Sequence, residues 1–339
     1  MLKKRAIFTI FLCSLNSYIG AATVANRDFL SVGQGARANA LGEAYSAVAD
    51  DPSAIYWNPA GLTQLSSDEI SASFADRFDG LATEAQMHYA RRGRTGMWGF
   101  AYAGSYVNNI SVTPSLSAAD IDAIQTGTFA ATDHPQKSVM DHALLFSYAR
   151  PLFPDSPHSV GTTVKLIYRD FLGMVHGYGT AVDIGYHWVI SDSLRFGANL
   201  QNIASVTTYQ GTIDNLGVKA TATESYIPNL KTGFAYTPGL HLLGGKLMLI
   251  ADFNMLTSFD VESYNAGVEY AFGQNIALRA GKIFGRQHDS TQDYTLGMGL
   301  SLGHVVLDFA FLSNELGQTT RGTVGWKLGG AYADPGKYH

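Results

Sequence analysis

The stretch that decides the fold runs from Gly33 to Leu62 and reads GQGARANALGEAYSAVADDPSAIYWNPAGL. Small residues dominate it and charges are few, which favours a segment enclosed by the rest of the chain. The good helix formers of Ala36–Ala49 predict a short helix. The turn Asp50–Ser53 predicts a second helix start, with Asp as N-cap and Pro at the first helical position. Asn58–Gly61 should end the segment, because the residue before a proline avoids helical conformations.

The composition has few charges and many glycines and aromatics. Only 15% of the 339 residues are charged, against roughly 25% in a usual soluble protein. The chain has 36 Gly, 18 Tyr and 18 Phe, which suits an outside that faces lipid, an inside of small residues and rims of aromatics. The net charge of −5 gives no reason to expect nucleic acid as a partner.

The first residues, from Met1 to about Ala22, predict a secretory signal peptide. Lys3–Arg5 form a positive region, Ala6–Leu15 an apolar region, and small residues follow, so that cleavage after Ala25 is a second option. The apolar run is too short for a membrane helix, which needs ~20 residues. The one cysteine of the chain, Cys13, lies in this signal, so the mature chain should hold neither a disulfide nor a thiolate metal ligand. These features predict an exported protein, either soluble or a barrel.

Period-two alternation bounded by turn residues predicts about fourteen strands after the opening stretch. They lie at 66–74, 82–91, 95–107, 139–150, 158–170, 177–190, 193–202, 229–237, 245–256, 262–272, 274–284, 291–302, 303–313 and 320–329. The connections after even-numbered strands are short, whereas those after odd-numbered strands include the two longest, 108–138 and 203–228. Short turns at one end and long loops at the other are typical of outer-membrane barrels.

The alternation also predicts which way side chains face. One face of each strand is lipid-compatible, and the other carries a few charges among glycines. A Lys or Arg on the lipid face would cost about 2–4 kcal/mol near the midplane of the membrane. We therefore expect the strand charges to face the lumen: Lys165, Asp183, His187, Arg195, Lys231, Asp252, Glu269, Arg279, Asp308 and Lys327.

Motifs of enzymes and metal sites are not evident. The ten histidines include no HExxH spacing, and no serine lies in a G-x-S-x-G elbow. Asp50-Asp51 could bind a cation or act as a proton-linked switch, but a helix cap is the favoured interpretation. We expect no catalytic residues, no metal and no cofactor, and an outer-membrane lipid hydrolase stays open as the enzymatic alternative.

The run GARANALGEAYSAVADDPSAIYWNPAGL resembles the amino-terminal hatch of the FadL/PorV family of outer-membrane proteins, and its wording is most similar to PorV/PorQ-like members. In that family a small-residue segment, an acidic turn and an Asn-Pro-Ala-Gly box precede the first strand. The matching residues are Gly35, Ala36, Arg37, Ala38, Gly42, Glu43, Ala44, Ala49, Asp50, Asp51, Asn58, Pro59, Ala60 and Gly61.

The resemblance implies an all-β fold, a transmembrane antiparallel β-barrel with a small N-terminal hatch inside the lumen. The expected division is a signal peptide at 1–22, a hatch at 23–65, the barrel at 66–329 and a tail at 330–339. The expected location is the outer membrane of a Gram-negative type envelope, in contact with its lipid.

As to function, the resemblance implies a passive transporter of hydrophobic, fatty-acid-like small molecules gated by the hatch. The candidate gating residues are Asn58, Pro59, Ala60 and Gly61, with Asp50 and Asp51. The candidate ligand-lining residues are Ile55, Tyr56, Trp57 and Leu62 in the hatch, with Met248, Ile250 and Val306 in the wall. The alternative for the Asn-Pro-Ala-Gly box is a turn that defines the fold whatever the function.

A second function stays open. PorV-like members of the family imply a partner-binding barrel of a type IX-like protein secretion system, which would contact secretion-system proteins or exported cargo. The polar loops 108–138 and 203–228 would then carry the function.

Overall fold

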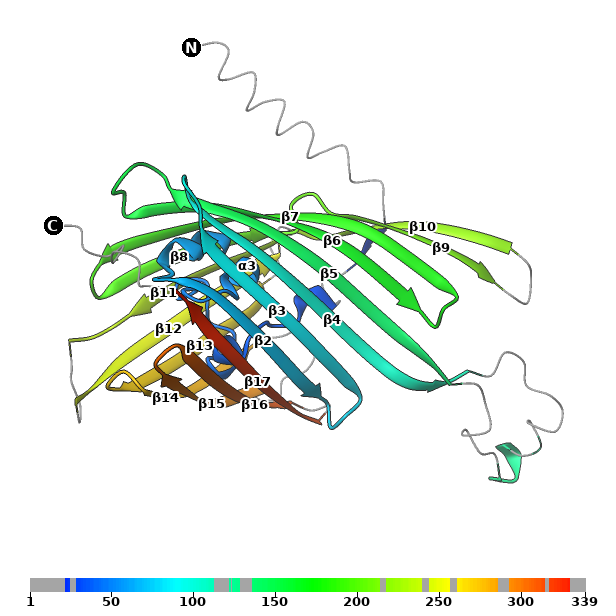
Figure 1. Ribbon diagram of the computed structural model, residues 1–339. Coiled ribbons are helices and arrows are strands. Elements are labelled where there is room, and N and C mark those ends of the chain that lie inside the picture. The colour runs from blue at the N-terminus through cyan, green and yellow to red at the C-terminus, as the bar shows by residue number, and fades with distance from the viewer. Residues whose placement is uncertain are drawn as a thin grey trace, which may run out of the picture.

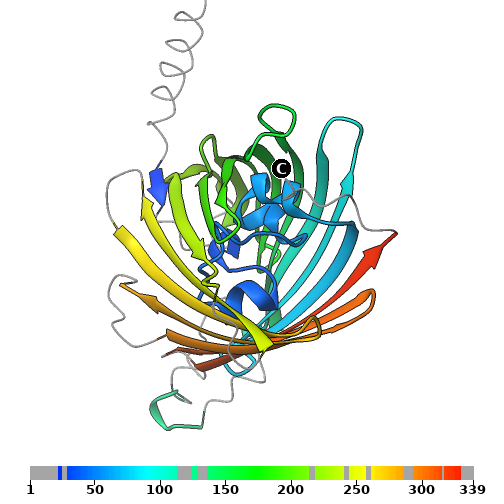
Figure 2. The ribbon, with the colours of Figure 1, turned by 90° about the vertical axis from the view of Figure 1, so that its left-hand side faces the viewer.

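The wall of the molecule is one sheet that closes on itself around an N-terminal segment (Figures 1 and 2). This computed structural model describes residues 22–24, 29–112, 122, 124–128, 136–213, 218–239, 244–256, 261–285, 293–314 and 317–329. The predicted signal peptide up to residue 21 and the predicted tail lie outside the described residues.

The strands alternate in direction along the chain. In chain order they are β1 Ala22–Val24, β2 Asp68–Arg77, β3 Ala82–Arg92, β4 Met97–Ser111, β5 Gln136–Pro151, β6 His158–Phe171, β7 Val175–Ser191, β8 Leu194–Gln201, β9 Val206–Ile213, β10 Val218–Tyr226, β11 Asn229–Tyr236, β12 Gly245–Leu256, β13 Val261–Phe272, β14 Ile276–Phe284, β15 Asp293–Leu302, β16 Val305–Asn314 and β17 Gly317–Leu328. Apart from β1, which lies parallel to the end of β10, neighbouring strands pair antiparallel.

The barrel is closed by the pairing of β17 with β2. The strands β8 and β9 both pair with β7, one along each half of it, so they form one wall strand that is broken in the middle. In the same way β11 pairs with β8 and β10 with β9. Counted so, the wall has 14 strands, which confirms the predicted fold class.

The prediction of a loop at 203–228 is wrong. The chain forms the hairpin β9–β10 there, which extends the wall, and only 214–217 lie outside the described residues. Thr, Val and Tyr are frequent in this stretch, and they fit an extended strand even where the side chains are polar. The break before it falls at Asn202, whose φ of 58° interrupts the strand. Of the loop predicted at 108–138, its first and last residues belong to β4 and β5, and 113–121, 123 and 129–135 lie outside the described residues.

The facing of the side chains follows the predicted alternation. Leu249 is 41% exposed on the outside, whereas its neighbour Ile250 is 4% exposed on the inside. The charges expected in the lumen lie there, buried, paired with inner groups or lining an inner cavity: Lys165, Asp183, His187, Lys231, Asp252, Glu269, Arg279, Arg195, Asp308 and Lys327.

Two aromatic bands mark the height of the apolar outer surface. On β6 and β7, His158 stacks on Tyr186 and Trp188 at one end, and Tyr168 packs against Tyr178 with tilted rings at the other. Tyr178 and Trp188 are ten residues apart on β7, so at ~3.4 Å per residue and a tilt of roughly 40° the bands lie about 25 Å apart. This is the height expected for the lipid-facing band of a membrane barrel.

The segment of residues 29–65, called the inner segment below, contains the short helices. They are η2 Phe29–Ser31, α2 Ala36–Ala40, α3 Ala54–Trp57 and η3 Pro59–Gln64. No helix among the described residues is long and apolar enough to cross a membrane.

Two details of the predicted helices are wrong. The helix expected over Ala36–Ala49 stops at Ala40, because Gly42 and Glu43 take positive φ of 66° and 62°. The second helix begins at Ala54 after Ser53, not after an aspartate. Asp51 instead accepts a hydrogen bond of 2.8 Å from the Ser53 amide, which closes the turn before α3.

Candidate functional site

The inner segment lies inside the barrel (Figure 2). Nearly all of its side chains between Gly33 and Leu65 are buried. The wall makes room with glycines, since a Cβ on Gly197 or Gly281 would come closer than 3.0 Å to the backbone at Ser46 or Gly42. The inner segment therefore touches the wall with its backbone at these positions.

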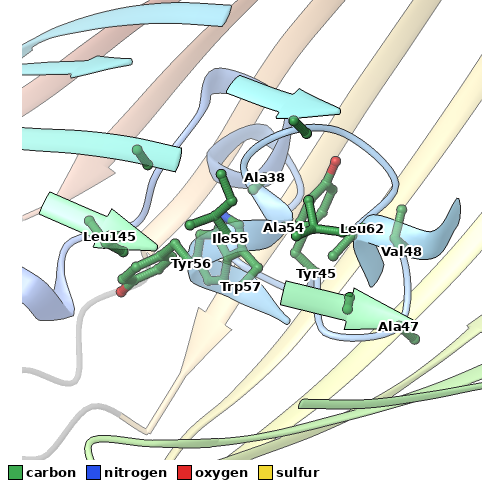
Figure 3. Close-up of a cluster of buried hydrophobic side chains, with 14 of the residues drawn as sticks. Ala38, Tyr45, Ala47, Val48, Ala54, Ile55, Tyr56, Trp57, Leu62 and Leu145 are labelled. Carbon is green, nitrogen blue, oxygen red and sulfur yellow. The ribbon is translucent and has the colours of Figure 1, made fainter. Parts of the chain in front are cut away.

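One side of the inner segment is apolar. Ile55, Tyr56, Trp57 and Leu62 are fully buried in a cluster that includes Leu145 of β5 (Figure 3). The rings of Tyr56 and Trp57 meet edge to face at 5.0 Å.

The wall completes this apolar cluster. Ile167 of β6 and Ile250 of β12 belong to it, and Met248 packs against it half-buried. Tyr226, at the break between β10 and β11, is also a member. The structure thus brings together the predicted lining residues except Val306, and the cluster reaches from the inner segment to the broken strands of the wall.

The opposite side of the inner segment is held by charges. The Arg37 guanidinium pairs with Asp50 of the same segment and with Glu269 of β13, and the network continues through Arg279 to Asp308. Burial opposes the charge on Arg37, but the Asp50 and Glu269 carboxylates outweigh it and raise the pKa of Arg37 well above its usual value. The guanidinium is therefore a permanent cation that ties the inner segment to the wall.

The two predicted gating aspartates have different contacts. Asp50 pairs with Arg37 and, at 3.6 Å, with Arg195 of β8. Asp51 accepts a 2.7 Å hydrogen bond from the Tyr45 hydroxyl. Burial raises the pKa of Tyr45, so the phenol remains a donor. Asp50 is thus an anchor to the wall and not a helix cap.

The Asn58–Gly61 box lies against β7. The Asn58 amide donates to the Ser46 carbonyl at 2.8 Å and to the Tyr186 carbonyl at 3.0 Å, and it accepts from the Ala60 amide at 3.2 Å. Asn58 thus joins two turns of the inner segment to the wall.

Replacing Asn58 with leucine should lower the free energy of unfolding by about 2–3 kcal/mol, because three hydrogen bonds of ~0.5–1.5 kcal/mol each are lost. The measurement is thermal unfolding of the purified protein in detergent. Gln64→Leu is the matched control, because Gln64 bonds only to its neighbour Thr63 among the contacts described. Equal unfolding temperatures for the two variants would contradict the conclusion that Asn58 joins the inner segment to the wall.

A polar cavity of about 370 Å³ lies between the inner segment and the wall formed by β2 and β13–β17. Arg37, Asp50, Glu69 and Lys327 line it, as does Val306, the wall residue that lies apart from the apolar cluster. None of the other predicted lining residues borders this cavity. The described residues hold no group of three or more His, Cys, Asp or Glu side chains that could bind a metal ion.

The sequence analysis did not name the buried ion pair of Arg321 on β17 with Glu84 on β3, nor the pairing of two residues that were both expected in the lumen. Lys165 of β6 lies 2.8 Å from Asp183 of β7, and the two side chains are 1% and 0% exposed. Asn202, at the break between β8 and β9, accepts from Lys165 at 3.0 Å and donates its backbone amide to Asp183 at 2.9 Å. The pair therefore holds the break of the wall strand in place. The positive φ of Asn202 leaves no signal in the sequence beyond the residue type.

Comparison with known proteins shows the fold. No known family model matches the sequence, and no curated protein matches it. The P. putida toluene transporter TodX matches with a TM-score of 0.61 at 11% identity, covering 89% of this chain and 100% of that chain. The CymD monoaromatic hydrocarbon channel matches with a TM-score of 0.56 at 12% identity, again covering 89% and 100%. This chain has the fold of outer-membrane barrels. The structures that it resembles are channels rather than enzymes.

Proposed function

We propose that this protein is an outer-membrane channel through which hydrophobic small molecules, fatty-acid-like or aromatic, diffuse passively, with the inner segment as its hatch. The observation that carries the proposal is the apolar cluster between α3 and the wall at β5, β6 and β12, which lies apart from the cavity beside the charged network. Apolar lining with few polar groups is the usual character of a site for a hydrophobic ligand.

An open water-filled pore does not fit this barrel. Tyr45, Tyr56 and Trp57 are fully buried in its interior, and on the opposite side ion pairs tie the inner segment to the wall beside the cavity. A water-soluble solute would have to displace these groups. A hydrophobic molecule can instead exchange contacts with the apolar cluster, which has the same character as the molecule itself.

The fixed and the adaptable parts of the hatch differ. The α2 side is anchored by charges, through Arg37 and Asp50, whereas α3 is held by apolar packing and by neutral hydrogen bonds such as that from Thr163 to the Ile55 carbonyl. Neutral hydrogen bonds contribute only ~0.5–1.5 kcal/mol each. We therefore assign the gating movement to α3 and to the adjoining Asn58–Gly61, with Ile55, Tyr56, Trp57, Leu62, Met248 and Ile250 along the route.

The secretion alternative has less to rest on. One of the two loops that would bind a partner, 203–228, is the wall hairpin β9–β10. The FadL-like transporter is thus the function that the geometry supports best.

The test is ligand binding to the purified, delipidated protein in detergent. We expect saturable binding of a fluorescent fatty acid that toluene displaces, and weaker binding by Asn58→Ala, because that change loosens the segment next to α3. Gln64→Ala serves as the matched control. Absence of binding by a well-folded barrel would contradict the transporter proposal. Binding of a protein partner by the outer loops would then be tested by cross-linking.

A further inference from the structure

A row of asparagines faces the lumen where the broken wall strands meet. Asn199 of β8, Asn229 of β11 and Asn254 of β12 are all buried, with exposures of 0%, 5% and 5%. The register places Lys231 of β11 opposite Asn199 on one side and opposite Asn254 on the other. Asn229 is two residues from Lys231 on the same face of β11, so the three amides surround one lysine.

Each of the three asparagines has an amide oxygen, Oδ1, without a hydrogen-bond partner among the described residues. A buried polar atom left unsatisfied costs about 1–3 kcal/mol, and native proteins rarely keep several of them together. Three such oxygens on neighbouring strands indicate a place where something else supplies the hydrogen.

Which atom of each amide is the oxygen follows from the bonds of the nitrogen. The Asn199 nitrogen donates to the carbonyl of Trp57 at 2.9 Å, and a carbonyl can only accept. Asn265 donates to the Gly42 carbonyl, so its own oxygen faces the nitrogen of Asn254 at 3.3 Å. The unused atoms of Asn199 and Asn254 are therefore acceptors, and a ligand at this place must offer an O–H or an N–H.

The surface next to the asparagines is aromatic. The Asn199 and Gln201 nitrogens both donate to the carbonyl of Tyr56, and the Lys231 ammonium lies 4.7 Å from the centre of the Trp57 ring. These rings belong to the apolar cluster. A flat apolar molecule that takes a place beside these rings when α3 moves would meet the asparagine oxygens, because the bonds between Asn199 and α3 use only the amide nitrogen.

We propose that Asn199, Asn229 and Asn254 form a specificity site that favours a planar hydrophobic molecule bearing a hydroxyl or N–H donor, such as a phenol, over a plain hydrocarbon of the same shape. This inference rests on the proposed function, and it names the substrate class of the same route. The oxygens accept the hydrogen bond of the ligand while the rings of α3 bind its apolar face.

The test compares phenol with toluene, which differ by a hydroxyl in place of a methyl group. Binding of each is measured on the purified protein by displacement of a fluorescent fatty acid. The variant is Asn229→Leu/Asn254→Leu, because leucine has the branched shape of asparagine without its polar atoms and both changes leave the bonds of Asn199 to α3 intact. Gln86→Leu is the control, since Gln86 is a buried inward amide of β3 whose oxygen already accepts from the Gly35 amide.

We expect the affinity ratio of phenol to toluene to fall about tenfold in the double variant and to stay unchanged in the control, as the loss of one to two hydrogen bonds from neutral groups implies. Asn229→Leu alone, which removes no described hydrogen bond of the protein, should give part of the fall. A ratio that is the same in wild type and in both Asn variants, with toluene still bound, would overturn the specificity site and leave the channel proposal intact. Failure of the wild type to bind either molecule would instead contradict the channel, and the inference with it.

Discussion

The double variant Gly197→Ala/Gly281→Ala is expected to open the barrel to water-soluble solutes. It adds one methyl group at each of two wall glycines, and these groups should displace the inner segment from its position in the lumen. The new Cβ atoms would meet the backbone at Ser46 and at Gly42, which cannot move aside as the end of a flexible side chain can. Overpacking costs about 1–3 kcal/mol per site when side chains can shift. The two new methyl groups, one on β8 and one on β14, would each meet backbone atoms of the inner segment. They should therefore displace this segment while the strands of the wall stay paired.

Liposome swelling in a sugar solution measures this opening, and we expect the rate for the double variant to rise at least about tenfold over wild type. Trypsin cleavage after Arg37, which is now held by Asp50 and Glu269, should appear at the same time. Gly325→Ala is the control, because its Cβ would meet only Val306 at an ordinary 3.6 Å and backbone oxygens farther away. A double variant as impermeable and as protease-resistant as the control would contradict the close contact between the inner segment and the wall at Gly197 and Gly281.

The second large effect is expected for Lys165→Met, which leaves the Asp183 carboxylate buried without its cation. Removing one partner of a buried ion pair costs about 3–5 kcal/mol. The turn at Asn202 should loosen too, since its side-chain oxygen loses the hydrogen bond from the Lys165 ammonium. Unfolding temperature in detergent is the readout.

Two further variants separate the ion pair from a general effect of mutation. Lys165→Met/Asp183→Asn should recover most of the loss, because it removes the stranded charge. Lys327→Met should cost less than about 1 kcal/mol, because Lys327 is a partly exposed lysine of the inner face and exposed charges contribute little. A single Lys165→Met variant as stable as Lys327→Met would show that the pair does not hold the wall.

The strands of the barrel were predictable because the residues of each strand alternate between types suited to lipid and types suited to the lumen. Leu249 and Ile250 illustrate this, since the lipid and the lumen select alternate side chains whatever the partner strand is. The hairpin β9–β10 was missed because its faces are polar and its strands do not show that contrast. The end of α2 was missed because Gly42 and Glu43 turn the chain in response to the wall at Gly281.

The contacts of the inner segment could not be predicted from sequence, because they join residues far apart in the chain. Asp252 accepts hydrogen bonds from the amides of Tyr45 and Ser46 across 207 and 206 positions, and Arg37 reaches Glu269 across 232. Only the register of the closed barrel brings them together. The sequence did indicate that Tyr56, Trp57 and Ile250 belong inside, but not which side of the lumen is apolar and which is charged.

The most direct test of a channel for hydrophobic molecules is uptake of radiolabelled toluene and of a labelled sugar by cells whose outer membrane contains this barrel, against cells without it. We expect faster uptake of toluene with the sugar unchanged, because ion pairs hold the charged side of the inner segment to the wall while the apolar cluster at α3 admits the hydrocarbon. Sugar uptake that rises together with that of toluene, or toluene uptake that the barrel does not change, would contradict the channel proposal.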